Sequence, residues 1–134
     1  MQDFMTITKA LADENRVRLL LALRGGQLCV CQMIELLGLA PSTVSKHLSI
    51  LNQARLVEKR KEERWIYYGL VGENGSQQAK EAIAWVSKSL SKHGKVLEDA
   101  RRLKQILCLD PKELCKKLNL PRSCGYTKKR RSGG

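Results

Sequence analysis

Long apolar runs are missing from this sequence, and so is the pattern of a secretory leader. No stretch reaches the roughly 18–20 consecutive apolar residues that a membrane-spanning helix needs, so we expect no membrane partner. The first residues, MQDFMTITKALADENR, lack a charged segment followed by an apolar block, which predicts that there is no signal peptide. Both absences predict a cytoplasmic protein. Because disulfides rarely persist in that reducing compartment, we expect the five cysteines to be thiols.

Acidic residues are also scarce. The chain has 13 aspartates and glutamates against 25 lysines and arginines, which gives a formal net charge of +12. A strongly basic surface attracts polyanions. Nucleic acid is therefore the first partner that the composition predicts.

The rest of the composition is that of one folded domain with an appendage. Of the 134 residues, 43% are hydrophobic and 28% are charged, which excludes a disordered chain. A domain of this size buries a modest core, so association with a second copy would add to its stability.

Helical periodicity dominates the first half of the chain. The expected helices cover residues 4–12, 14–24, 29–38 and 41–54. Asp13 is placed as an N-cap of the second helix, and Gly38 as the end of the third. Pro41 suits the first position of the fourth helix.

In the second half of the chain, the pattern of apolar residues changes from that of helices to that of strands. Residues Leu56–Arg60 and Arg64–Leu70 are expected to be two strands around a short charged turn. One long helix is then expected from about Gln77 to about Leu107, and a short one follows over residues 111–119. Apolar residues step alternately by four and three along the long helix, which is the pattern of a helix packed along a partner helix. We expect this seam to join two copies, and packing on its own domain is the alternative; its members are Ala79, Ile83, Val86, Leu90, His93, Leu97 and Ala100.

This order of elements predicts a mainly α fold with a small β-hairpin, the winged helix-turn-helix. The helix that begins at Pro41 would be the recognition helix, with short donors and cations on its outer side that suit base edges and phosphates. The hairpin's basic residues would flank the duplex backbone, although an ordinary solvated hairpin is the alternative, as is a helix-packing role for His47. The predicted DNA-binding residues are Ser42, Thr43, Ser45, Lys46, His47, Arg60, Lys61 and Arg64.

Four segments together resemble a known family: LADENRVRLLLAL, LCVCQM, PSTVSKHL and RWIYYGL. They are similar to the ArsR/SmtB family of metal-sensing repressors, over about residues 4–95. The Cys-Val-Cys box at the start of the first helix of the helix-turn-helix is closest to the arsenic-sensing branch.

This resemblance implies a homodimer, joined through its terminal helices, that binds double-stranded operator DNA. It implies a repressor of an arsenic-resistance operon, and not an enzyme, that leaves the DNA when As(III) or Sb(III) binds. The metalloid is the inducer, and no obligatory cofactor is implied.

The sequence also departs from the family pattern. Ile34 stands where many such arsenic sensors have a third cysteine, and Arg55 where a glycine commonly precedes the first wing strand. We therefore assign residues 1–107 to a DNA-binding and dimerisation domain. Residues 108–134 form a cysteine-containing basic extension whose end, PRSCGYTKKRRSGG, contains five basic and no acidic residues.

Cys29 and Cys31 are the expected metalloid ligands, because thiolates select soft ions. Residues i and i+2 of a helix point to nearly opposite sides, whereas in an extended segment they point the same way. The two sulfurs can therefore grip one ion only if the first helical turn is unformed or unwinds, which would supply a switch. The alternative is that both cysteines are small core residues.

Three other cysteines are candidates for a third sulfur ligand to the metalloid. Cys108 and Cys115 would lie roughly 10 Å apart on one helix, too far to share an ion, and we interpret each as a core or surface residue. Cys124, in the basic arm, is the predicted third ligand. Binding by two sulfurs and a solvent ligand is left open.

Three alternative functions are a redox sensor, a zinc or cadmium sensor, and an enzyme. A redox-sensing repressor would use the same fold and the same thiols, but would respond to peroxide. A zinc or cadmium sensor would draw ligands from the long helix, where His93, Glu98 and Asp99 are the candidates. Cys124 has the spacing of a phosphatase loop to a later arginine, but no buried strand precedes it, so we expect no enzyme.

Overall fold

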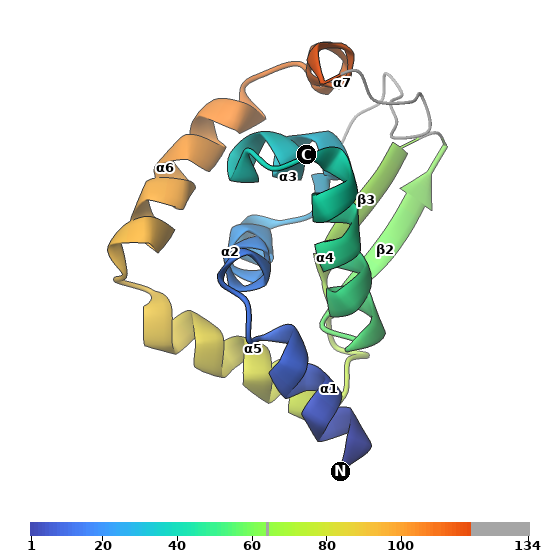
Figure 1. The fold of residues 1–134 in the computed structure, drawn as a ribbon, viewed down its shortest axis with the longest axis vertical. Helices are drawn as coiled ribbons and strands as arrows, with labels where there is room; N and C mark the ends of the chain where they lie inside the picture. The colour runs from blue at the N-terminus through green and yellow to red at the C-terminus, as the bar shows by residue number, and fades with distance from the viewer. Residues whose placement is uncertain (64, 119–134) are drawn as a thin grey trace.

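Seven α-helices and three short strands make up residues 1–63 and 65–118, the part of the chain that the computed structural model describes (Figure 1). No helix in these ranges combines the length and the apolar composition that crossing a bilayer requires. The helices are α1 (Gln2–Ala10), α2 (Glu14–Ala22), α3 (Val30–Leu37), α4 (Pro41–Gln53), α5 (Gln77–Leu90), α6 (Gly94–Leu107) and α7 (Pro111–Lys117), with a 3₁₀ turn at Leu23–Gly25. The strands are β1 (Leu28–Cys29), β2 (Val57–Glu62) and β3 (Trp65–Leu70).

The predicted helix-turn-helix and hairpin are confirmed, with small differences at the ends of the elements. The Asp13 carboxylate caps α2 by accepting the backbone N–H groups of Asn15 at 2.8 Å and Arg16 at 3.2 Å. Gly38 ends α3 with a φ of 68°, a left-handed conformation that glycine adopts at little cost. Pro41 begins α4. The order α3, α4, β2, β3 is that of a winged helix-turn-helix.

The predicted long helix from Gln77 to Leu107 is wrong, because it is broken into α5 and α6. His93 is the N-cap of α6, and its Nδ1 accepts the backbone N–H of Lys95 at 3.1 Å. A capping side chain competes with continued helix, and the glycine at position 94 is a poor helix former. The break falls inside the predicted seven-residue seam, so the seam does not run along one helix.

The two halves of that seam have different surroundings. Val86 of α5 is buried, and Leu90 packs beside it against Leu21 of α2 and Val96 of α6. Leu97, on α6, has 45% of its surface exposed. The α5 half therefore contributes to the core of its own chain, as the alternative interpretation held.

A third strand that the sequence analysis missed joins the hairpin. β1 pairs antiparallel with β3, so the sheet has the order β1-β3-β2. In this register Leu28 lies opposite Tyr68, and Cys29 lies opposite Tyr67. β1 is only two residues long, which is too short to give an alternating hydrophobic pattern. It nevertheless ties the start of α3 to the wing.

Arg55, just before β2, has a φ of 61°. A residue with a Cβ is strained in this left-handed conformation, whereas glycine is not. The sequence departure from the family pattern at this position therefore has a structural cost, because the turn still has the geometry that a glycine would suit.

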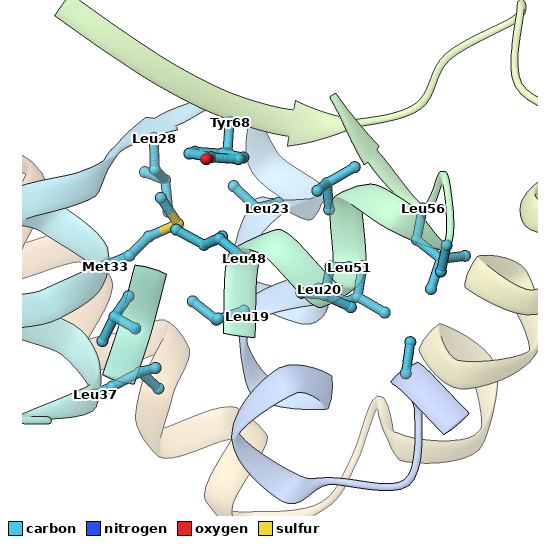
Figure 2. Packing of buried hydrophobic residues seen from close by; sticks show 14 of the residues in the cluster. Leu19, Leu20, Leu23, Leu28, Met33, Leu37, Leu48, Leu51, Leu56 and Tyr68 are labelled. Atoms are coloured by element: carbon cyan, nitrogen blue, oxygen red, sulfur yellow. The ribbon is translucent and has the colours of Figure 1, made fainter. Parts of the chain in front are cut away.

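The core lies between α2, α3, α4 and the inner face of the wing (Figure 2). Leu19 and Leu20 of α2 pack with Leu48 and Leu51 of α4, and all four have 2% or less of their surface exposed. Burial of one such leucine contributes about 1.5–3 kcal/mol. The ring of Tyr68 lies above this layer, and its burial raises the pKa of its hydroxyl group. The recognition helix is thus fixed by its apolar side.

One ion pair joins α2 to α6. Arg18 donates from Nε and Nη2 to the two carboxylate oxygens of Asp99, at 2.8 and 3.0 Å. The two side chains have only 12% and 11% of their surface exposed. The hydrogen bonds that Arg18 donates to Asp99 raise the pKa of Arg18, so the guanidinium stays charged.

We expect Asp99→Asn to lower the free energy of unfolding by about 3 kcal/mol, because it leaves the Arg18 charge buried without its carboxylate. Urea denaturation followed by circular dichroism measures the change. Glu98→Gln is the matched control: its side chain is 64% exposed, so its removal from a surface pair should cost less than about 0.5 kcal/mol. Equal losses in the two variants would show that the Arg18–Asp99 pair does not hold α6 in place.

Candidate functional site

The outer face of α4 carries most of the residues predicted to contact DNA. Val44 and Leu48 face the core, whereas the predicted contact residues of the first turns are exposed. These exposed residues are Ser42, Thr43, Ser45 and Lys46. The helix therefore presents short donors and one cation on a surface that a groove of DNA can accept.

His47 is half-buried and lies against α2. Its Nδ1 is 3.2 Å from Nη1 of Arg16, whose Nε and Nη2 donate to the carbonyl oxygens of Ala10 and Lys9 at the end of α1. These contacts give His47 the helix-packing role that was its alternative interpretation, and its contact with DNA stays a prediction. Arg16 thus connects α1, α2 and the recognition helix.

The Asp13 carboxylate belongs to the same corner. Burial opposes its charge, but the backbone N–H groups of Arg16 and Asn15 outweigh that effect, and the pKa of Asp13 lies below its usual value. The nearby charges of His47 and Arg16 act in the same direction. The carboxylate therefore keeps its capping contacts at neutral pH.

The wing presents basic side chains along β2. Beyond Val57 every residue of this strand is exposed, including Lys59, Arg60 and Lys61. Arg60 donates to the Glu62 carboxylate at 3.3 Å in a solvent-exposed pair, which is too weak to hold it there. Arg64, the other predicted wing contact, lies outside the described residues.

The two cysteines of the Cys-Val-Cys box are buried and already converge. Cys29 and Cys31 have 1% and 0% of their surface exposed, and their Sγ atoms are 3.0 Å apart. Cys29 is the N-cap of α3 with extended backbone, at φ −87° and ψ 163°, and the helix begins at Val30. Of the two predicted conditions, an unformed or an unwinding first turn, the structure has the first: Cys29 is not yet helical, so the box lies across the boundary between strand and helix.

The surroundings of the thiols are apolar. They belong to a cluster with the rings of Trp65 and Tyr67 from β3 and with buried residues of three helices, namely Leu36, Ile106 and Leu114. The backbone N–H of Cys29 donates to Oε1 of Gln32 at 3.0 Å, which fixes the start of α3. The Cys31 thiol donates to the carbonyl oxygen of Pro111 at 3.7 Å.

The geometry of the pair fits a soft ion. A metal–thiolate bond is about 2.3 Å long, so two sulfurs on one ion lie less than about 4.6 Å apart. The separation of 3.0 Å between Cys29 and Cys31 is within this reach. Within residues 1–63 and 65–118, no three side chains of His, Cys, Asp or Glu are grouped closely enough to hold a metal. The box thus offers two sulfurs at a separation that one ion can span.

The other cysteines differ in their surroundings. Cys108 is exposed at the end of α6. Cys115 of α7 is half-buried and packs against the cluster that contains the box. The sequence analysis missed this proximity, because nothing in the local pattern tells which face of the chain a short terminal helix covers. Cys124, the predicted third ligand, lies outside the described residues.

The candidate zinc or cadmium ligands of the C-terminal helices are engaged elsewhere. Asp99 is paired with Arg18, and the His93 ring caps α6. Glu98 pairs with Lys95 on the surface, at 3.6 Å. These contacts disfavour the alternative site on this part of the chain.

Comparison with known proteins agrees with this geometry. Residues 13–59 match the model of the family described as bacterial regulatory protein, arsR family. The chain is 40% identical over 65 residues to the arsenic resistance transcriptional regulator ArsR1 of Pseudomonas putida, which covers 48% of this chain and 51% of that protein. It is 33% identical over 82 residues to a cadmium resistance transcriptional regulatory protein, a CadC homolog, of Staphylococcus aureus, which covers 60% and 68% respectively. The chain thus spans about half the length of the first of these relatives.

A solved structure shares the fold. HlyU from Vibrio cholerae N16961 superposes with a TM-score of 0.59 and 28% identity, over 68% of this chain and 95% of that one. The match extends beyond the helix-turn-helix, because nearly the whole of that chain is covered. Together with the relatives, it establishes that the chain belongs to the ArsR family of bacterial regulatory proteins.

Proposed function

We propose that this protein is a transcriptional repressor that responds to arsenite or antimonite. It binds operator DNA as a homodimer in the cytoplasm, and it leaves the DNA when the trivalent metalloid binds cysteine thiolates. The observation that carries the proposal is the buried Cys29–Cys31 pair, with its sulfurs 3.0 Å apart, at the point where β1 meets α3. It is the kind of ligand pair that selects soft, thiophilic ions.

DNA binding is supported by shape and charge together. The exposed residues of α4 and the basic side chains of β2 belong to neighbouring elements of one winged helix-turn-helix, and the chain carries a net charge of +12. A basic chain gains most of its non-specific affinity from phosphates, and the polar face of α4 supplies groups for base edges.

Release of the DNA on metalloid binding is supported by the position of the two thiols of the box. The backbone of Cys29 pairs with Tyr67 in β3 of the wing, and Cys31 lies in α3, which packs on the recognition helix α4. A core at this density transmits small displacements. A metalloid held by both sulfurs therefore acts on the wing and on α4 from one point, and release follows if the free shape binds the metalloid more tightly than the DNA-bound shape.

A homodimer is supported by exposed apolar side chains on α1 and α5, which lie at one end of the molecule (Figure 1). Phe4 and Met5 of α1 are 52% and 43% exposed, and Trp85 of α5 is 66% exposed. The two helices contact each other. Large apolar side chains that stay exposed on two contacting helices are candidates for an interface. Terminal helices are thus the proposed dimer contact, although Leu90 now belongs to the monomer core.

A thiol-based redox sensor is the second candidate, and the same sulfur separation favours it, since two such thiols can be oxidised together. The release of operator DNA by peroxide and by arsenite must therefore be compared side by side, and zinc and cadmium should be tested in the same assay. The arsenite proposal requires that the reduced protein lose its DNA in arsenite without any oxidant.

Lys46→Ala should weaken operator binding and lower the slope of affinity against salt by about one per protomer, because a phosphate contact is lost. Fluorescence anisotropy with labelled operator at several salt concentrations measures both. Lys104→Ala removes the same charge from exposed α6 and should have little effect on the slope. An unchanged slope in the Lys46 variant would remove α4 from the DNA interface.

Cys29→Ser and Cys31→Ser should each keep operator binding but lose release by arsenite, because serine offers a hard, protonated oxygen in place of a thiolate. The measurement is operator release during an arsenite titration under reducing conditions. Cys108→Ser, at an exposed thiol, is the control and should release like the parent. If both box variants still release DNA at the parent's arsenite concentration, the binding site lies elsewhere.

Trp85→Glu should weaken the dimer roughly thirtyfold, as expected for the loss of an interface hot spot of about 2 kcal/mol. Analytical ultracentrifugation over a range of concentrations measures the dissociation constant. Gln105→Glu adds the same charge on the exposed side of α6 and should leave the dimer intact. A dimer of parental strength in the Trp85 variant would place the interface on another surface.

A further inference from the structure

We propose that Cys115 of α7 supplies the third thiolate of the metalloid site, so that one chain binds As(III) or Sb(III) through Cys29, Cys31 and Cys115. This inference rests on the proposed function and names a ligand that the family pattern does not provide, since Ile34 occupies the usual third position. Helix α7 would then move toward the thiol pair when the metalloid binds.

The first support is the docking of α7 on the element that carries the box. Leu114 is 2% exposed and belongs to the same apolar cluster as Cys29 and Cys31, and Cys115 packs against that cluster. Figure 1 shows α7 beside α3, at the end of the molecule opposite α1 and α5. Helix α7 and the thiol pair therefore pack in the same apolar cluster.

Polar contacts hold α7 in the same place. Nζ of Lys117 lies 3.2 Å from Oε2 of Glu35 on α3, and Nη2 of Arg102 on α6 lies 2.8 Å from the same oxygen. The Glu35 side chain is only 12% exposed. One carboxylate therefore links α6 and α7 to α3, one helical turn beyond the box.

The second support is the contact between the box and the first turn of α7. The thiol of Cys31 donates to the carbonyl oxygen of Pro111 at 3.7 Å. In an α-helix that carbonyl accepts the backbone N–H of the residue four positions later, which is Cys115 in α7. Residues four apart also lie on one face of a helix. The Cys31 sulfur therefore lies against the face of α7 that carries Cys115.

The chemistry of the cluster favours a third thiolate over a solvent ligand. A trivalent centre with three thiolates carries no net charge, whereas two thiolates leave a charge or a bound hydroxide to be buried. Burial of an unpaired charge among apolar side chains is costly, and the rings of Trp65 and Tyr67 line this cluster. A neutral trithiolate suits these surroundings.

The binding step balances without any oxidant. Arsenous acid, As(OH)₃, exchanges its three hydroxyl groups for three thiols. Three As–O bonds break and three As–S bonds form, and each hydroxyl leaves with one thiol proton as water. Arsenic stays trivalent and each sulfur keeps its oxidation state.

A small movement has to complete the site, because no three ligands are grouped beforehand in the described part of the chain. The element that would shift is α7, because it is seven residues long and carries Cys115. Leu114, which is 2% exposed, keeps this helix docked on the cluster, so the shift would have to be small. Closure of α7 would then accompany metalloid binding.

The test is arsenic X-ray absorption on the full-length, reduced protein loaded with one equivalent of arsenite. The parent should show three sulfur neighbours. Cys115→Ser and Cys115→Ala should each show two sulfurs and one oxygen, and the arsenite dissociation constant should rise roughly a hundredfold with the loss of one of three tethered ligands. Cys108→Ser, the exposed control on α6, should keep three sulfurs and the parent's affinity.

Circular dichroism and operator affinity show whether each variant is folded, and the alanine variant repeats the test without a side-chain oxygen. Retention of three sulfurs in both Cys115 variants, with the loss of one sulfur in Cys124→Ser, would overturn this inference and leave the proposed function intact. Three sulfurs in Cys29→Ser or Cys31→Ser, or no arsenite binding by the parent, would overturn both proposals.

Discussion

The functional part of this structure depends on one change in backbone conformation, at Cys29. Because Cys29 is extended and its neighbour Val30 is helical, the two sulfurs of the box lie on one side and 3.0 Å apart. The same extended residue pairs with Tyr67 in the wing. Strand pairing, helix capping and the separation of the two sulfurs thus depend on a single residue, so a change in one of them affects the other two.

The rest of the chain surrounds this junction with rigid supports. On one side, the leucines of α2 and α4 fix the recognition helix to the core. On the other, the cluster of the box extends to α6 and α7, where Ile106 and Leu114 are buried. The junction is therefore enclosed by parts of the chain that lie far apart in sequence, and in the proposed function these contacts would connect a bound ligand to the DNA-binding elements.

The sequence alone predicts those features of the fold that depend on neighbouring residues, such as the ends of helices. Asp13, Gly38 and Pro41 mark helix ends through capping, a left-handed φ and a fixed φ, and each is found at its predicted place. The exposed side of α4 followed in the same way from its apolar spacing. The cysteine box is recognisable from the sequence because thiolates select soft ions and because Cys-Val-Cys resembles the arsenic-sensing branch.

Long-range contacts account for what sequence reasoning missed. The break at His93 depends on a side-chain cap that interrupts a plausible apolar seam. The short strand β1 exists only because β3 lies beside it. The place of α7 depends on the burial of Leu114 beside residues of α3 and β3 that lie far from it in the sequence, and local periodicity does not predict such a contact. The sequence alone therefore points to Cys124 as the third ligand, whereas Cys115 packs against the cluster that contains the box.

The distance between the thiol pair and the end of the molecule that holds α1 and α5 has a consequence for binding stoichiometry. The thiol pair lies near α7, at the end opposite the apolar surface of α1 and α5 (Figure 1). In the proposed dimer, two copies joined through those helices would carry their thiol pairs at opposite ends of the assembly. One metalloid ion could not then bridge the two Cys29–Cys31 pairs, so each chain would bind its own ion and a saturated dimer would hold two.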